Sequence, residues 1–209
     1  WKHRLLFGRG MISDDTEHTF MVAQSLLEHP DDPEAFQHAF ARRLRWWFAA
    51  LPAGVGLGTL RACMKLWLGF GPERSGVRSA GNGPSMRSAI VGVYHADYPA
   101  AIDAYVRRAT VITHTDPRAL VGAMAIAHGA RLACAHRKGT SFRFGCVLDA
   151  IRPLAPEDLE WQSLMDEISQ ALEIGLEAPE FAARLGLAEG VTGYAYHTVP
   201  VCLYAWMRH

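Results

Sequence analysis

Apolar residues recur at intervals of three and four along most of this chain, and that spacing constrains the fold more than any other feature of the sequence. The clearest case lies between Pro33 and Leu51, where the apolar positions are Phe36, Phe40, Leu44, Trp47 and Leu51. Residues at this spacing share one face of an α-helix, with Arg42, Arg43 and Arg45 turned towards water. No segment alternates apolar and polar residues convincingly, as a half-buried strand would. The sequence therefore predicts an all-α fold.

Proline and glycine punctuate the periodic segments and divide the chain into about eight to ten helices. The expected helices cover residues 16–28, 33–51, 57–68, 86–95, 98–112, 118–136, 157–176, 179–185 and 194–207. The segment 118–136 is apolar nearly all round and contains Gly122 and Gly129, so we expect a central helix that its neighbours approach closely. A polar break follows at Lys138–Arg143. The loop from Gly69 to Gly83 is long, and loops of that length in compact domains are commonly functional.

The composition is that of one globular domain spanning residues 1–209. Half of the 209 residues are hydrophobic, enough for one well-buried core. The 21 basic and 21 acidic residues cancel, so the chain lacks the broad charge that favours nucleic acid or anionic membranes as partners. The longest uncharged apolar run, from Ala119 to Ala130, is too short to span a bilayer. The four cysteines are scattered without a Cys-x-x-Cys pair, which favours reduced thiols and a cytoplasmic protein.

The segment from Ser13 to Thr19 concentrates hard oxygen ligands at the start of the first expected helix. It holds three acids, three hydroxyls and one imidazole. Asp14 and Glu17, three residues apart, fit a capping box that orders the helix start. That interpretation does not need Asp15 or the flanking hydroxyls, whereas a Mg²⁺ or Mn²⁺ site would use carboxylate and hydroxyl oxygens of this kind. Both interpretations stay open on this segment alone.

A glycine-rich turn precedes the fourth expected helix. Gly81 and Gly83 allow the backbone to approach a ligand closely, and Asn82 tolerates tight-turn geometry. Ser85 and the free amides at the start of the following helix could bind a phosphate, with Arg87 nearby. An ordinary turn from a loop into a helix carries similar residues, so the spacing alone does not decide between the two.

Two other turns differ in how strongly they suggest a ligand. Asp116 followed by Pro117 predicts a helix cap, which leaves His114 unexplained. That histidine could face a cleft and bond to a sugar or phosphate oxygen, or it could be a structural residue. The turn of residues 52–58 holds three glycines, but no Gly-Lys-Ser/Thr follows it. We therefore interpret this turn as a plain connector.

The order of these segments is more specific than any one of them. The three in sequence are Ser13-Asp14-Asp15-Thr16, Gly81-Asn82-Gly83-x-x-Met86-Arg87 and Thr113-His114-x-Asp116-Pro117-x-Ala119. Together they resemble the motifs of the ADP-ribosylglycohydrolase family. The stretch from Gly193 to Trp206 also resembles the penultimate helix of that family, so the resemblance runs along most of the chain.

This resemblance implies a compact, single-domain orthogonal multi-helix bundle with two Mg²⁺ or Mn²⁺ ions at the base of a cleft. By the resemblance, the metal ligands are Ser13, Asp14 and Asp15, and the two aspartates are catalytic. The residues expected to border ADP-ribose are Gly81, Asn82, Gly83, Ser85, Met86, Arg87 and His114. The ions would fix the ribose hydroxyls and polarise a water, while carboxylates would stabilise oxocarbenium character on the ribose.

The implied reaction is hydrolysis of the N- or O-glycosidic bond between ADP-ribose and an acceptor, which is an ADP-ribosylated protein or a small ADP-ribose conjugate. Two motifs of the family do not occur in the 209 residues: an upstream Gly-Asp-Ala-x-Gly stretch and a Gly-Gly-Asp-Thr-Asp-Thr segment after the last helix. We therefore expect only half of the two-metal ligands in this chain. The alternative is a catalytically incomplete relative that binds ADP-ribose or has a structural, crystallin-like role.

Overall fold

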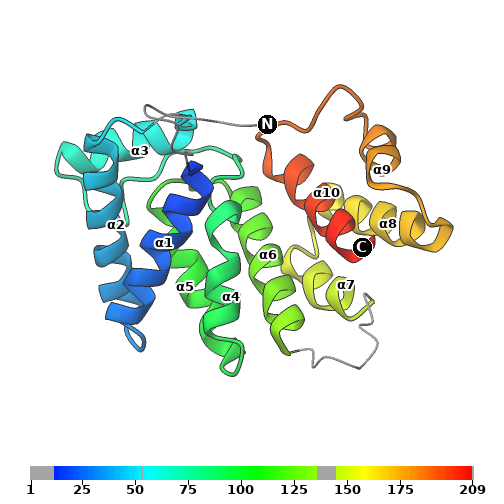
Figure 1. Ribbon diagram of the computed structural model, residues 1–209, viewed down its shortest axis with the longest axis horizontal. Helices are drawn as coiled ribbons and strands as arrows, with labels where there is room; N and C mark the ends of the chain where they lie inside the picture. Colours follow the sequence, from blue (N-terminus) through cyan, green and yellow to red (C-terminus); the bar gives the residue numbers. More distant parts are fainter. Residues whose placement is uncertain (1–11, 53, 136–144, 209) are drawn as a thin grey trace.

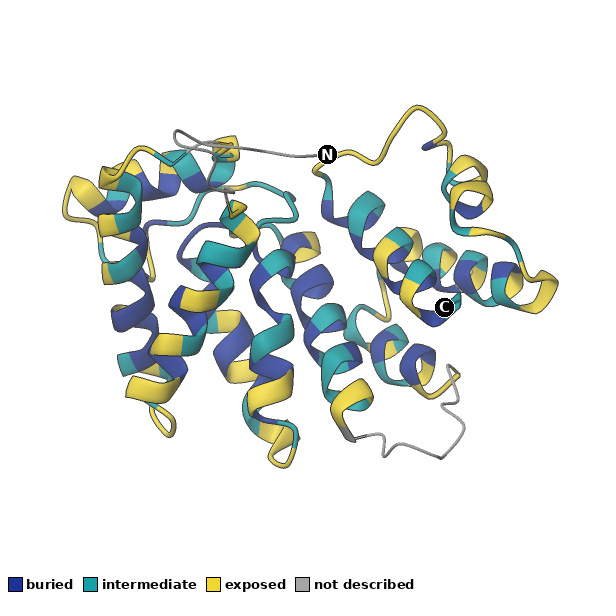
Figure 2. Cartoon of the chain, in the orientation of Figure 1, coloured by how far each residue is buried: buried dark blue, intermediate teal, exposed yellow. Residues whose placement is uncertain are grey.

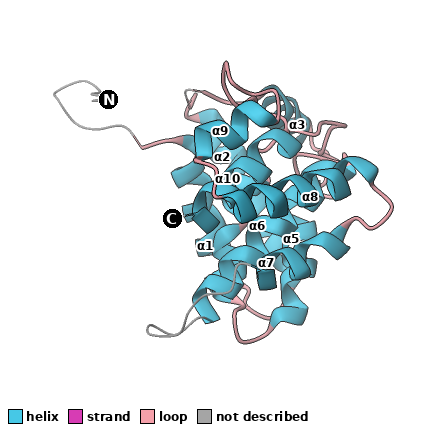
Figure 3. Cartoon of the chain, turned by 90° about the vertical axis from the view of Figure 1, so that its right-hand side faces the viewer, coloured by secondary structure: helices cyan, strands magenta, loops and turns pink. Residues whose placement is uncertain are grey.

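The computed structural model of the chain is built from helices and connecting loops (Figure 3). It describes residues 12–52, 54–135 and 145–208, and within these ranges no β-strand occurs. Two isolated β-bridges, Val77 with His114 and Gly81 with Tyr194, are the extended pairings there. The prediction of an all-α fold is confirmed. Within the same ranges, no helix is both long enough and apolar enough to cross a bilayer.

The helices follow the predicted order with small shifts at their ends. Their bounds are α1 Asp14–Glu28, α2 Pro33–Ala49, α3 Leu57–Trp67, α4 Ala89–Tyr94, α5 Pro99–Val111, α6 Pro117–Ala135, α7 Gly145–Ile151, α8 Leu159–Ile174, α9 Ala178–Arg184 and α10 Ala195–Arg208. The helix expected over residues 86–95 is split into a 3₁₀ turn, Ser85–Arg87, and α4. Helix α7 was not predicted, and the polar break at 138–143 lies outside the described residues.

Helix α6 lies at the centre of the molecule, between α1–α5 and α7–α10 (Figure 1). Its two faces belong to two hydrophobic cores. We call the one formed with α1–α5 the first core, and to it α6 contributes Ala123 and Ala127. The second core, formed with α7–α10, receives Val121 and Ala125. A helix that is apolar on both sides is buried between its neighbours, as the sequence predicted.

Close packing around α6 depends on small residues. A methyl group added at Gly122 would lie 3.1 Å from Ser85 Oγ and 3.1 Å from a methyl group of Val199. On the neighbouring α4, a methyl group at Gly92 would lie 1.9 Å from the carbonyl oxygen of Ala127, which no side chain tolerates. The two helices therefore approach each other at backbone distance. Figure 2 shows where the buried residues, coloured dark blue, lie along the helices.

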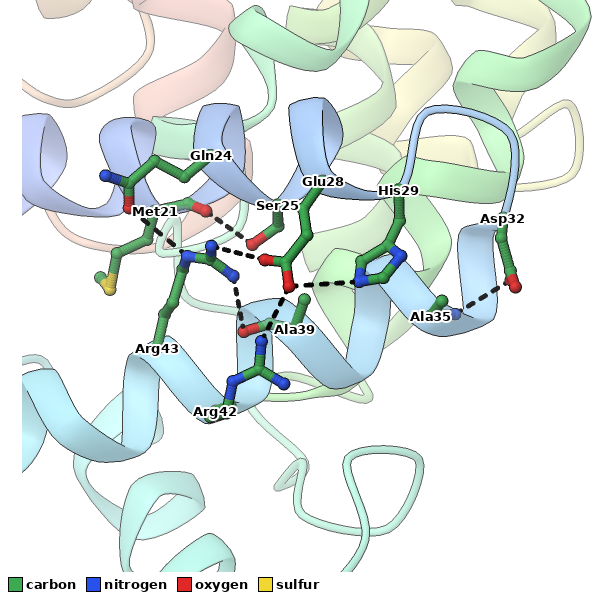
Figure 4. Close-up of polar contacts among 10 residues, drawn as sticks. All are labelled: Met21, Gln24, Ser25, Glu28, His29, Asp32, Ala35, Ala39, Arg42 and Arg43. Atoms are coloured by element: carbon green, nitrogen blue, oxygen red, sulfur yellow. Dashed lines mark hydrogen bonds and ion pairs between the residues drawn. The ribbon is translucent and has the colours of Figure 1, made fainter.

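Polar contacts at the end of α1 connect it to α2 (Figure 4). The Glu28 carboxylate accepts hydrogen bonds from Arg42 at 3.1 Å and from Arg43 at 2.6 Å. Asp32 caps α2 by accepting from the amides of residues 34 and 35, both at 3.0 Å. Arg42 and Arg45 are exposed as predicted, but Arg43 is half-buried, and its guanidinium also donates to the Ala39 carbonyl.

Candidate functional site

The segments singled out in the sequence meet at one cavity of about 340 Å³, which we call the polar cavity. Asp14 and Asp15 line it from the start of α1, and His114 lines it from the turn between α5 and α6. The turn of Gly81–Gly83 contributes the facing wall, together with Gly193 from the segment before α10. Residues up to 179 positions apart in the sequence, from 14 to 193, therefore share one cavity.

A second cavity of about 340 Å³ shares Asp15, Asn82 and Met86 with the polar cavity. Its wall also includes Ser85, whose Oγ is buried and has no hydrogen-bond partner among the described residues. A still larger apolar cavity, about 570 Å³, lies between α4, α6 and α10. Its lining residues are apolar or cysteine, so among these three cavities the polar chemistry lies in the two smaller ones.

The start of α1 is not capped as predicted. Ser13 is the N-cap residue, and its side chain makes no capping hydrogen bond. The carboxylate of Glu17 accepts a hydrogen bond from Trp47 Nε1 at 2.7 Å, across to α2. The predicted capping box between Asp14 and Glu17 is therefore wrong, because a tertiary contact takes the glutamate away from the helix start.

Asp14 and Asp15 consequently present two adjacent carboxylates at the cavity. Partial burial, and then the charge of Asp14, raise the pKa of Asp15 above its usual value. Neither residue forms an ion pair with a residue that the structure describes. Oxygen donors of this kind suit Mg²⁺ or Mn²⁺. The described residues include no group of three or more His, Cys, Asp or Glu that could hold a metal ion, so these donors fit part of a coordination shell.

Backbone pairing holds the long loop of residues 69–83 in place. The amide of Asn82 donates to the Gly193 carbonyl at 2.8 Å, and the amide of Ala195 donates to the Ala80 carbonyl at 2.8 Å. The Asn82 side chain adds a bond to Thr198 Oγ1 at 3.2 Å. The glycine-rich turn is thereby fixed to the start of α10, which is why these two distant segments line the same cavity.

A second pairing fixes the loop to the turn that carries His114. The amide of Val77 donates to the Thr113 carbonyl at 3.2 Å, and the amide of Thr115 donates to the Val77 carbonyl at 3.0 Å. His114 is buried between these segments, only 4% exposed. Burial, and then the charge of Arg87, lower the pKa of the imidazole to about 3, so the ring is neutral at physiological pH.

Three glycines surround the imidazole of His114. A methyl group added at Gly58 would lie 2.8 Å from Nε2, and one at Gly81 would lie 3.0 Å from the same atom. A methyl group at Gly83 would lie 3.0 Å from Cε1. None of the three has a positive φ angle, so glycine is required here for space and not for backbone conformation.

Arg87 lies behind the site rather than in it. Its side chain is 1% exposed and lies in the wall of neither of the two smaller cavities. The guanidinium bonds to His18 Nδ1 at 3.2 Å, to the Ala109 carbonyl at 2.9 Å and to Thr113 Oγ1 at 2.6 Å. Burial lowers its pKa to about 9, which leaves it positively charged at neutral pH. Its positive charge acts on the cavity without direct contact, by lowering the pKa of His114.

Part of the turn of residues 52–58, interpreted from the sequence as a plain connector, lines the polar cavity. Gly54, Gly56 and Gly58 all belong to the wall, and Gly58 contacts His114. The alternating glycines were the available signal. A phosphate-binding motif does not reveal their role, because these glycines provide room for a side chain from elsewhere and do not form a phosphate-binding loop.

Comparisons with known proteins agree with the sequence motifs. A family model described as ADP-ribosylglycohydrolase matches residues 2–209. A solved structure titled ADP-ribosylglycohydrolase-related protein complex superposes with a TM-score of 0.63 at 26% identity, covering 95% of this chain. An uncharacterized protein of Archaeoglobus fulgidus is 36% identical over 121 residues, or 56% of the chain.

The chain is shorter than both of these proteins. The matched region makes up 60% of the solved chain and 38% of the Archaeoglobus protein. The similarity therefore covers nearly all of this chain in the solved structure but less than two thirds of either relative.

Proposed function

Since the chain belongs to the ADP-ribosylglycohydrolase family, we propose that it forms the ADP-ribose side of a metal-dependent hydrolase. The reaction is cleavage of the N- or O-glycosidic bond between ADP-ribose and an acceptor. The acceptor is a side chain of an ADP-ribosylated protein or the remainder of a small ADP-ribose conjugate. We further propose that residues 1–209 form one partial domain of this type and act in the cytoplasm.

The observation that carries this proposal is the meeting of Asp14 and Asp15 with His114 and the Gly81–Gly83 turn at one cavity. A carboxylate pair opposite backbone and imidazole groups suits a ligand that combines a sugar with phosphates. The carboxylates can hold a water and stabilise positive charge on the ribose ring. The amides and the imidazole of the opposite wall can donate hydrogen bonds to the phosphate and sugar oxygens of the nucleotide part.

Ser13, Asp14 and Asp15 would hold Mg²⁺ or Mn²⁺, and the family commonly uses Mg²⁺. The raised pKa of Asp15 supports this assignment, because two adjacent carboxylates without a cationic partner are stabilised by a bound cation. When bound, a divalent ion supplies Lewis acidity at the ribose and neutralises the carboxylate pair. The remaining ligands of a two-ion site would come from outside the residues that the structure describes.

The walls of the cavity have separate tasks in this proposal. The glycine turn lets the nucleotide approach the backbone closely, and its two backbone pairings keep it from moving when the ligand binds. Ser85 and Met86 border the neighbouring cavity that opens next to Asp15 and provide its contact surface. The buried charge of Arg87 raises the potential at the cavity and favours an anionic ligand.

An activity assay tests the proposal on the intact protein. Peptides ADP-ribosylated on arginine or on serine are incubated with Mg²⁺ or with a chelator, and released ADP-ribose is measured. We expect metal-dependent release from at least one peptide. Asp15→Asn keeps the size of the side chain but removes its charge, and should lower the rate at least about a hundredfold, as removal of a group that acts on the transition state typically does.

Glu17→Gln is the matched control. It removes an acid from the same helical turn, outside the two smaller cavities, and its amide oxygen can still accept from Trp47. This variant should retain its activity within about threefold, as a change of similar size and shape away from the chemistry should. An intact protein that binds ADP-ribose but releases none from either peptide would support the non-catalytic alternative instead.

A further inference from the structure

We propose that Arg87 and Thr113 are positioning residues that fix His114 in one neutral tautomer, with its proton on Nε2, so that the ring presents an N–H donor to the polar cavity. The inference rests on the proposed function only for the identity of the ligand. The tautomer itself follows from contacts in the protein interior.

The three side chains form a continuous path from the first core to the cavity. Arg87 donates from a terminal nitrogen to Thr113 Oγ1 at 2.6 Å. Thr113 Oγ1 in turn lies 2.8 Å from His114 Nδ1. All three residues are at most 4% exposed, so water does not compete for these bonds. The order of donors and acceptors along the path is therefore set by the side chains.

The first bond has only one direction. A guanidinium carries donors and no acceptor, so Thr113 Oγ1 must accept from Arg87. The hydroxyl then has one proton to donate, and two acceptors are within reach. Nδ1 of His114 is 2.8 Å away, whereas the Thr110 carbonyl is 3.5 Å away, beyond the usual hydroxyl bond length. The hydroxyl therefore donates to the imidazole.

An Nδ1 atom that accepts a hydrogen bond carries no proton. A neutral imidazole holds its single proton on the other nitrogen, which is Nε2. The ring is kept neutral by its burial and by the positive charge of Arg87, which would repel an imidazolium. One arginine thus acts twice, by charge and by hydrogen bonding through Thr113.

Nε2 points where a ligand can reach it. No residue that the structure describes forms a hydrogen bond with this nitrogen, and the ring lines the polar cavity. Gly58 and Gly81 leave room next to Nε2, as their missing side chains would lie within about 3 Å of it. His114 therefore offers a fixed, uncharged donor to an oxygen of the bound molecule, and never an acceptor.

Nitrogen-15 NMR on the free protein tests the tautomer directly. The two ring nitrogens of His114, assigned by comparison with His114→Gln, differ in chemical shift according to which one is protonated. At pH 7.5 we expect a protonated Nε2 and an unprotonated Nδ1 in the wild type. A protonated Nδ1 in the wild type overturns the proposal without any variant being needed.

Two variants of Thr113 separate the hydroxyl from the fold. Thr113→Ser keeps the hydroxyl and should keep the Nε2–H tautomer. Thr113→Val keeps the shape but removes the hydroxyl, and should shift His114 to a mixture of tautomers or to Nδ1–H. An unchanged tautomer in a folded Thr113→Val protein would show that the hydroxyl does not fix the ring, and the inference would then be lost.

Calorimetric binding of ADP-ribose adds a functional readout. The affinity of Thr113→Val should fall about tenfold, corresponding to the loss of one well-oriented hydrogen bond, while Thr113→Ser should stay within about twofold. Equal affinities for the two variants count against the positioning role. If no variant and no wild-type protein binds ADP-ribose, the proposed function fails, whereas the NMR result still decides the tautomer.

Discussion

The two hydrophobic cores on either side of α6 differ in how many polar side chains are buried next to them. Among the residues that the structure describes, every buried polar or charged side chain other than tyrosine and tryptophan lies between His18 and His114, on the side of the first core. These include three histidines and Arg87, whose guanidinium lies 5.0 Å above the ring of Phe40. The first core therefore contains charge and hydrogen-bonding capacity at its centre.

The second core is aromatic, and each polar tip is satisfied close by. Trp161 Nε1 donates to the Ile151 carbonyl at 3.2 Å. The Tyr204 hydroxyl donates to the Leu176 carbonyl at 2.6 Å, and the ring stacks on Phe181 with centroids 4.1 Å apart. In both cases the hydrogen bond ends on a main-chain carbonyl and does not lead to the polar cavity.

The difference separates two tasks of the fold. A buried arginine without a carboxylate partner among the described residues costs stability, since its desolvation is only partly offset by neutral acceptors. The first core tolerates that cost and in return holds His114 at the polar cavity. The second core holds no side chain at the polar cavity, so its packing can serve stability alone.

Removing the largest ring of the second core should have the largest effect on stability. Trp161→Ala deletes a fully buried indole and should lower the free energy of unfolding by about 4 kcal/mol. At temperatures where the variant is folded, its affinity for ADP-ribose should change less than about twofold. Chemical denaturation and calorimetry measure the two quantities.

Trp46→Ala is the control for that variant, since Trp46 is 64% exposed and its loss should cost less than about 1 kcal/mol. If Trp161→Ala weakened ligand binding as strongly as it weakened folding, the two cores would not have separate tasks.

Acid should loosen the first core before the second. Burial lowers the pKa of His18 to about 2 and of His114 to about 3, from 6.5 in an unfolded chain. Between pH 6.5 and about 3 the unfolded state therefore binds more protons than the folded one, and stability falls as the pH falls. The slope reaches about 1.4 kcal/mol per pH unit for each histidine.

Hydrogen exchange at pH 7 and pH 5 locates this effect. Peptides of α1 and α4 should lose protection at the lower pH, while peptides of α8 and α10 should keep theirs until the molecule unfolds as a whole. Simultaneous loss in both groups would mean that α6 couples the cores too tightly for a local response.

Filling the space beside His114 should have the smallest effect. Gly58→Ala would normally favour the helix, but its methyl group would lie 2.8 Å from Nε2. We expect a net loss of about 1 kcal/mol in thermal or chemical unfolding and a shifted His114 resonance. Gly56→Ala, with no atom within 4 Å of the added carbon, should leave that resonance unchanged.

The sequence was most informative where local periodicity decides the structure. Helices α2 and α8 lie within two residues of where their apolar stripes predicted them, because burial of one helix face is a property of spacing. Leu51 is the exception, since α2 ends at Ala49 and Leu51 is 87% exposed. The family was also predicted correctly, since its motifs occur in a fixed order. The roles of the individual site residues stay predictions.

What the sequence did not reveal depends on contacts between distant segments. The spacing of Glu17 from Asp14 is that of a helix cap, but its carboxylate accepts a hydrogen bond from Trp47 of α2 instead. Arg87 was expected to border the ligand because it follows the glycine-rich turn. In the structure it bonds instead to the Ala109 carbonyl and to Thr113, contacts that the residues near it in the sequence do not indicate. Gly58 had no evident purpose until His114, 56 positions later, was placed against it.

The loop of residues 69–83 has a consequence for how this protein can diverge. Most of its attachment to the turn of His114 and to the start of α10 runs through main-chain amides and carbonyls, which every residue type except proline can supply in full. The side chains of Ser75 and Asn82 add one bond each, to the Ile112 carbonyl and to Thr198. Arg74 and Arg78 on the same loop are exposed. Substitutions at these two positions can therefore accumulate without displacing the cavity wall.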